Sequence, residues 1–124
     1  MKITQFTDFS LRFLMCLAQE PDRLVTIAEV ARVYGISAQH LKKVAQSLSA
    51  AGLATAVPGK NGGWRLARPP AEIDLGQLIR RQENLILLDC EGCPMRHCKL
   101  TRLFDQGLTA FLAVFDGKTL ADIV

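Results

Sequence analysis

The sequence predicts a mainly α-helical fold with one small β-hairpin and a long C-terminal helix. Helix-capping signals recur along the first half, a glycine-rich turn separates two short β-prone runs, and apolar residues recur every three or four positions near the end. The 124 residues are 49% hydrophobic and 22% charged, which is typical of a globular protein of one domain.

The first two helices are predicted from their boundaries. Residues 8–19 are densely apolar and end at a proline-containing turn over residues 20–22, which predicts a first helix. Thr26 and Glu29 have the spacing of a capping box, so a short helix should begin there. It should end near Gly35, since glycine readily takes the left-handed conformation that ends helices.

A third helix is expected directly after this turn. Ser37 can cap it, and its apolar positions follow the helical period at Leu41, Val44, Ala45 and Leu48. The opposite face is polar and basic, with Gln39, His40, Lys42, Lys43, Gln46 and Ser47. Two short helices joined by a glycine turn, with a basic second helix, indicate a helix-turn-helix.

A hairpin should follow the helix-turn-helix. Residues 53–57 and 64–67 are predicted strands, and the glycine-rich stretch 58–63 is the predicted turn between them. This is where a wing lies in a winged helix-turn-helix. Its tip carries Lys60 and Asn61, and the return strand carries Arg65 beside Trp64, which we expect to pack beneath the wing.

The second half should hold a short helix capped by Asp74 and a long helix from Lys99 onward. Apolar residues of the long helix recur at Leu100, Phe104, Leu108, Phe111 and Phe115, a stripe suited to a dimer seam. We therefore expect residues 1–68 to form the DNA-binding region and residues 69–124 the cysteine loop and dimerisation helix, within one structural domain.

Charge is distributed unevenly along the chain. Residues 1–68 hold nine Lys and Arg against four Asp and Glu, whereas residues 69–124 hold six against eight. The basic first half is where a phosphate backbone would be attracted. No apolar run is long enough for a membrane span, and the first residues lack the features of a signal peptide, so we expect a cytoplasmic protein.

Major-groove readout requires side chains that donate and accept hydrogen bonds, with cations nearby to hold phosphates. A solvated helix face could show the same residue types, but the capped helix before it and the hairpin after it favour duplex DNA as the partner. The expected DNA-binding residues are Ser37, Gln39, His40, Lys42, Lys43, Gln46, Lys60, Asn61 and Arg65.

Three of the four cysteines lie within nine residues. Cys90, Cys93 and Cys98 are separated by two and four residues, and a glycine and a proline can bend this segment around a centre. Thiolates suit both zinc and iron–sulfur clusters, and three of them leave one coordination position for another ligand. An unligated loop is the simpler alternative. Cys16 lies in an apolar run and should be a core thiol.

The order of these elements resembles that of the bacterial iron–sulfur transcription regulators of the NsrR and IscR family over nearly the whole chain. The resemblance is carried by the helix-turn-helix, the wing ending in 62–67, the three-cysteine loop and the long helix finishing at 119–123. The opening residues 1–9 look most like the nitric-oxide-sensing NsrR branch, and Thr101 stands where the IscR branch has a ligating histidine.

This resemblance implies a homodimeric repressor that binds a palindromic operator and carries a 4Fe-4S or 2Fe-2S cluster on Cys90, Cys93 and Cys98. In the NsrR branch the fourth ligand is an aspartate of the partner subunit, and Asp8 matches that position. Nitric oxide, another small oxidant, or iron status would be the signal. The close cysteine spacing leaves open a zinc site that includes His97 and staples a DNA-binding or interaction module.

An enzyme is not supported by the sequence. There is no Ser/His/Asp grouping and no phosphate-binding glycine loop before a helix. The acidic pair Asp89 and Glu91 lies in a loop with no expected pocket.

Overall fold

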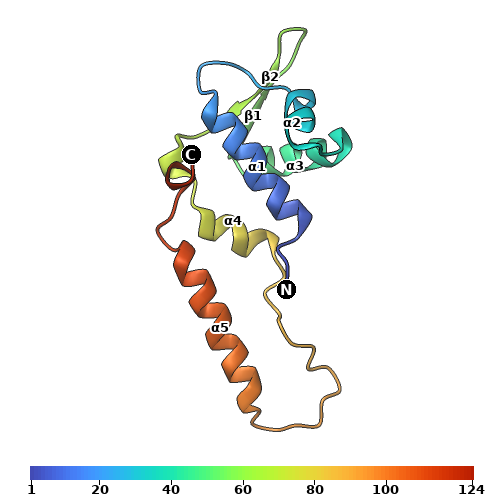
Figure 1. Cartoon of the computed structure of the whole chain (residues 1–124), viewed down its shortest axis with the longest axis vertical. Coiled ribbons are helices and arrows are strands. Elements are labelled where there is room, and N and C mark those ends of the chain that lie inside the picture. Colours follow the sequence, from blue (N-terminus) through green and yellow to red (C-terminus); the bar gives the residue numbers. More distant parts are fainter.

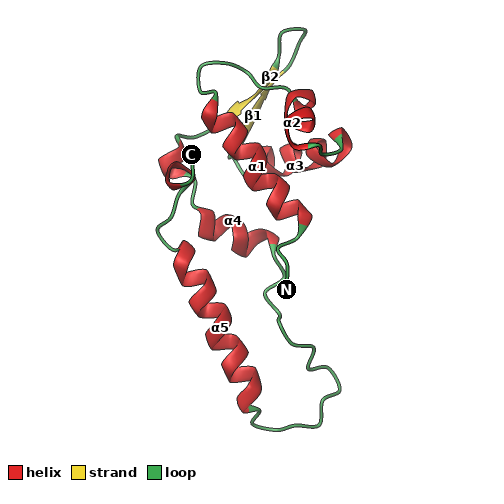
Figure 2. Cartoon of the chain, viewed as in Figure 1, coloured by secondary structure: helices red, strands yellow, loops and turns green.

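The computed structural model describes residues 1–124 and confirms a mainly helical fold with one hairpin (Figures 1 and 2). Single 3-10 turns lie at Pro70–Glu72 (η1) and Leu120–Asp122 (η2). The helices and strands are α1 (Gln5–Gln19), α2 (Ile27–Tyr34), α3 (Ala38–Ala50), β1 (Ala54–Val57), β2 (Gly63–Leu66), α4 (Leu75–Gln82) and α5 (Lys99–Phe115).

Helix α1 begins at Gln5 rather than at residue 8, because the Thr4 side chain accepts a hydrogen bond from the Thr7 N–H and caps the helix. The capping box at the start of α2 is formed as predicted, and the residue after α2, Gly35, has a φ of 64°. Ser37 occupies the N-cap position of α3, but its side chain makes no capping hydrogen bond.

The core is built from α1, α2, α3 and the hairpin, and the second half of the chain contributes to it. Leu120, in the 3-10 turn that follows α5, is fully buried, as is Ile73 just before α4. Their backbones meet, since the Leu120 N–H donates to the Ile73 carbonyl at 2.9 Å. The C-terminal turn therefore packs back against the domain that carries the helix-turn-helix.

The hairpin is antiparallel and pairs Ala54 with Leu66 and Val57 with Gly63. An additional bridge, which the sequence did not reveal, pairs Val25 with Trp64 through hydrogen bonds of 2.8 and 2.9 Å. The Trp64 ring lies edge-on to Phe13, with centroids 5.9 Å apart. Trp64 thus packs beneath the wing as expected and fixes the base of the wing to α1.

Helix α5 stands apart from this core, and the loop that leads into it lies at the opposite end of the molecule from the hairpin (Figure 1). Leu112 is the one buried residue of α5. The helix leaves large apolar side chains exposed at Leu100, Leu103, Phe104, Phe111 and Val114. No helix is long and apolar enough to cross a membrane.

Candidate DNA interface and cysteine site

Helix α3 presents two chemically distinct faces. Its apolar residues, from Leu41 to Leu48, are buried against the core. The polar residues predicted to read DNA are exposed on the other face: Gln39, His40, Lys42, Lys43 and Gln46. Ser37 is also exposed, directly before the helix. The helix therefore offers donors, acceptors and cations to solvent in the combination that major-groove readout requires.

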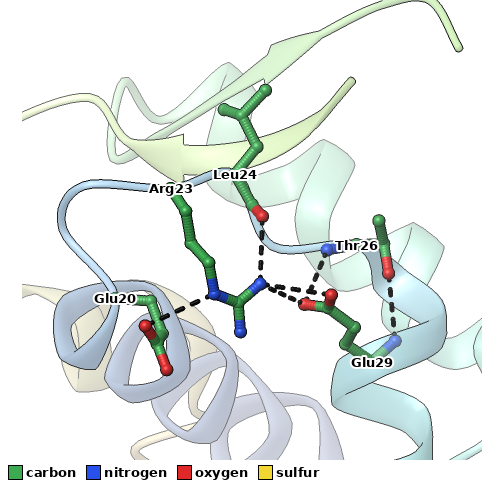
Figure 3. A network of polar contacts seen from close by, with 5 residues as sticks. All are labelled: Glu20, Arg23, Leu24, Thr26 and Glu29. Carbon is green, nitrogen blue, oxygen red and sulfur yellow. Dashed lines mark hydrogen bonds and ion pairs between the residues drawn. The ribbon is translucent and has the colours of Figure 1, made fainter. Parts of the chain in front are cut away.

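A polar clamp fixes how α1 leads into the helix-turn-helix (Figure 3). The Arg23 guanidinium donates to both Glu29 carboxylate oxygens, at 2.9 and 3.1 Å, and to the Leu24 carbonyl at 3.3 Å. It also lies 3.4 Å from a Glu20 carboxylate oxygen at the end of α1. The same Glu29 carboxylate accepts from the Thr26 N–H, so one side chain links the clamp to the cap of α2.

The hydrogen bonds of this clamp change the pKa of the Glu29 carboxylate. Hydrogen bonding to Arg23 is the main cause that lowers the pKa of Glu29; burial opposes it, and the Thr26 N–H lowers the pKa further. Because the pair is partly exposed, its contribution to stability is modest. The pair joins the end of α1 to the first turn of α2.

His40 has an intramolecular neighbour as well as a solvent-exposed position. Its ring lies 6.0 Å from the Phe9 ring of α1, in a tilted arrangement. A shallow pocket between α1 and α3 contains both residues, together with Gln5, Phe6, Lys43 and Val44. His40 on the polar face of α3 therefore also lies beside α1.

The wing carries its predicted residues at exposed positions. Lys60 and Asn61 lie in the turn and Arg65 lies on β2. The turn requires glycine at position 62, where an added Cβ would lie 2.0 Å from the Val57 carbonyl oxygen. The hairpin extends beyond the rest of the chain, so these side chains can reach a surface that the body of the domain does not touch (Figure 1).

The cysteine segment is an exposed loop between α4 and α5. Cys90 and Cys93 are exposed, Cys98 is partly buried, and none of them forms a disulfide. The loop turns sharply at Gly92, with a φ of 73°, and at His97, whose φ of 53° is the one positive value among non-glycine residues. A non-glycine residue in the left-handed region is uncommon, and here it marks a tight turn directly before Cys98.

Thr101, in the first turn of α5, links two of the cysteines. Its hydroxyl lies 3.9 Å from the Cys90 sulfur. Hydrogen bonding to the Thr101 side chain lowers the pKa of Cys98, and backbone hydrogen bonds at the start of α5 lower it further. Cys98 is therefore biased toward the thiolate, the form that binds soft metals.

The single chain does not assemble a closed metal centre. No group of three His, Cys, Asp or Glu side chains lies in a metal-binding arrangement, so Cys90, Cys93 and Cys98 do not converge with each other or with His97. Asp8 is instead paired with Arg12, whose Nε lies 2.6 Å from Asp8 Oδ1. The Arg12 guanidinium in turn lies over the Tyr34 ring, 5.5 Å from its centroid.

The structure also joins residues that sequence reasoning missed. Glu83, at the end of α4, accepts hydrogen bonds from Thr4 and Thr7 at the start of α1. These partners are more than seventy positions apart, and no periodic or spacing signal connects them. The pairing of Asp8 with Arg12 could have been found, because an acid and a base four positions apart on a helix are neighbours.

These features define a winged helix-turn-helix protein of the kind that regulates transcription. A family model described as Rrf2, iron-dependent transcriptional regulator, matches residues 3–124. The chain therefore belongs to the Rrf2 family. Regulators of this family bind DNA and are typically dimers, and they are not enzymes.

Solved structures show the same fold. IscR from T. potens is 27% identical with a TM-score of 0.81, over 99% of this chain and 85% of that one. The oxidized form of Staphylococcus aureus CymR is 27% identical with a TM-score of 0.80, over 97% and 93% of the two chains. CymR of B. subtilis, a global cysteine regulator, has a TM-score of 0.82 at 23% identity, which shows likeness of fold alone.

Proposed function

We propose that the chain is a homodimeric repressor whose operator binding is controlled by an iron–sulfur cluster on Cys90, Cys93 and Cys98. Nitric oxide or another small oxidant, or iron status, would be the signal. The observation that carries this proposal is the cysteine segment itself: three free thiols on a loop that leads directly into α5, a helix with one buried residue.

Operator contacts are assigned to α3 and the wing. Gln39, His40 and Gln46 would read base edges, while Lys42 and Lys43 lie beside them to hold phosphates. Ser37 would contact the backbone at the start of α3. In the wing, Lys60, Asn61 and Arg65 would contact the sugar-phosphate backbone next to the bound groove.

The second subunit is proposed to cover the apolar face of α5. This face borders an open groove that also includes Met1 and Leu87 and is almost wholly apolar. Burying it would stabilise a dimer by the hydrophobic effect, at about 25 cal/mol for each Å² of apolar surface removed from water. A two-fold dimer presents two copies of α3, which suits a palindromic operator.

The three thiols have the chemistry of iron–sulfur ligands, although within the single chain they do not converge on one centre. Three thiols, one of them biased toward the thiolate, provide soft anionic ligands. The chain's own aspartate at position 8 is held by Arg12, and the cysteine loop lies away from the rest of its own domain (Figure 1). By its resemblance to the NsrR branch, the fourth ligand is assigned to Asp8 of the partner subunit, which would have to give up the same ion pair with Arg12 to bind the metal.

When bound, the cluster would supply a centre that reacts with nitric oxide and with oxidants. The chain's own residues would make the arrangement of the two subunits depend on whether the cluster is bound. The cysteine segment of one subunit and Asp8 of the partner subunit would hold α5 of the first against α1 of the second. Without this contact, the two α3 helices would no longer be held at one separation, and half-sites one helical turn apart would be matched less well.

The test is an anaerobic titration of nitric oxide into iron-loaded protein bound to its operator, with the operator first selected from a random duplex library. We expect brown protein whose affinity falls as nitric oxide is added. Unchanged affinity would refute control by the cluster. Colourless protein that contains zinc would instead support a metal staple that includes His97.

The dimer is tested separately by Leu103→Glu, which places a charge on the exposed apolar face of α5. We expect monomers in sedimentation velocity at concentrations where the unmodified protein is dimeric. Thr109→Glu is the matched control, because Thr109 is exposed on the opposite side of the same helix. If the two variants sediment alike, the apolar face of α5 is not the dimer interface.

A further inference from the structure

The start of α1 is held to the end of α4 by one carboxylate. Glu83 Oε1 accepts from the Thr4 N–H at 3.0 Å, and Oε2 accepts from the Thr4 and Thr7 hydroxyls at 2.6 and 2.7 Å. Burial raises the pKa of Glu83, but these hydrogen bonds outweigh burial and lower it. The carboxylate is thus held ionised at the N-terminus of a helix, where negative charge is favoured.

Neighbouring polar groups extend this contact. Thr7 and Ser10 of α1 are the chain's fully buried polar residues. The Gln82 amide donates to the Ser10 hydroxyl at 3.1 Å, and that hydroxyl donates to the Phe6 carbonyl at 2.7 Å. The Gln82 carbonyl oxygen is buried without a partner. A shift of α4 along α1 would take the Glu83 carboxylate from the buried Thr7 hydroxyl and the Ser10 hydroxyl from the Gln82 amide, so this polar seam favours one register.

The polar seam between α1 and α4 adjoins both the cysteine segment and the helix that leads to the helix-turn-helix. Residue 84, next after Glu83, begins the segment that carries the three cysteines. On the other side of the seam, the first turns of α1 carry Asp8, and Phe9 packs beside His40 of α3. A displacement of the cysteine segment would therefore reach the polar face of α3 through Glu83 and α1.

We propose that Glu83 is the positioning residue that couples the cysteine segment of its own chain to the recognition helix, by latching the first turn of α1. Its three hydrogen bonds share one carboxylate, so a displacement of the end of α4 would break them together and give the latch a closed and an open state. The inference rests on the proposed function, since it assigns a route for the same regulation. Allosteric coupling of this kind needs such a two-state element.

The experiment compares regulation rather than stability. Operator affinity is measured for protein loaded anaerobically with Fe(II) and sulfide and for protein freed of metal with a chelator. The regulatory ratio is the quotient of the two dissociation constants. For the unmodified chain we expect a ratio of at least tenfold, and for Glu83→Gln a ratio reduced to less than about threefold, with iron content unchanged.

Matched variants separate coupling from charge and from folding. Thr7→Val removes one hydroxyl from the carboxylate and should lower the ratio, whereas Thr7→Ser keeps the hydroxyl and should restore it. Glu72→Gln removes the same charge from an exposed position on η1 and should leave the ratio unchanged. The Thr7 pair keeps the inference testable if Glu83→Gln fails to fold.

Hydrogen exchange provides the second readout. In the unmodified chain, exchange in a peptide covering residues 1–9 should speed up on metal removal, and in Glu83→Gln it should be fast in both states. If Glu83→Gln weakens loaded and metal-free protein by the same factor, the latch is merely structural and the inference is overturned. A ratio of one in the unmodified chain would instead refute the proposed function.

Discussion

Replacing Lys42 by alanine tests the DNA interface through the salt dependence of binding. Each phosphate neutralised by a cation contributes about 0.9 to the slope of log affinity against log salt. Lys42, Lys43, Lys60 and Arg65 are exposed on α3 and the wing, so a dimer would bring eight such cations to the duplex. If all of them contact phosphates, the slope should be about −7.

Lys42→Ala removes two of these contacts, one from each subunit, and should reduce the slope by about 1.8. Between 50 and 200 mM salt the unmodified dimer should lose about four orders of magnitude in affinity, and the variant about three. Fluorescence anisotropy with the selected operator at four salt concentrations measures both slopes. Lys118→Ala, an exposed charge beyond α5, is the control. An unchanged slope in Lys42→Ala would refute the assignment of Lys42 to the phosphate backbone.

Three further predictions address the cysteine site, the wing and the latch. Cys93→Ala should abolish iron uptake, measured by visible absorbance, and leave a folded dimer; Cys16→Ala, in the helix α1 that packs on the core, should retain the iron. Gly62→Ala should lower the free energy of unfolding in urea by about 1–3 kcal/mol, because its Cβ would clash with the Val57 carbonyl; an unchanged midpoint would contradict this. Since the pKa of Glu83 is lowered in the folded chain, ionised Glu83 stabilises the fold at neutral pH, and this contribution is lost as pH falls through the folded pKa. The difference in unfolding free energy between Glu83→Gln and the unmodified chain should therefore shrink below about pH 4, and a gap independent of pH would contradict it.

Local signals predicted the elements of this fold well. The capping box at Thr26 and Glu29, the left-handed Gly35 and the cap at Asp74 all involve partners within a few residues, so their chemistry is legible in the sequence. The start of α1 was misplaced because Thr4 was not recognised as its cap. Ser37 shows the opposite error, since a residue of the right type stands at an N-cap and forms no capping bond.

The long-range arrangement could not be predicted in the same way. Nothing local indicates that Val25 pairs with Trp64, because a bridge between separate segments depends on how the core closes. The same holds for Glu83 and Thr4, which meet only after α4 has packed against α1. The residue types of the cysteine site were visible from spacing, but their convergence was not, and the single chain does not provide it.

The open cysteine site and the uncovered face of α5 have one common physical explanation. Helix α5 has a single buried residue, whereas most helices in proteins are stabilised chiefly by tertiary packing. A second subunit that covers α5 would bring its own Asp8 toward the cysteine segment, so the ligand set would be completed by the same contact that buries the apolar face. Loss of that ligand would then weaken the dimer contact directly, and the separation of the two α3 helices would change with it. If sedimentation showed a dimer of identical strength with and without metal, the two features would be independent and this explanation would fail.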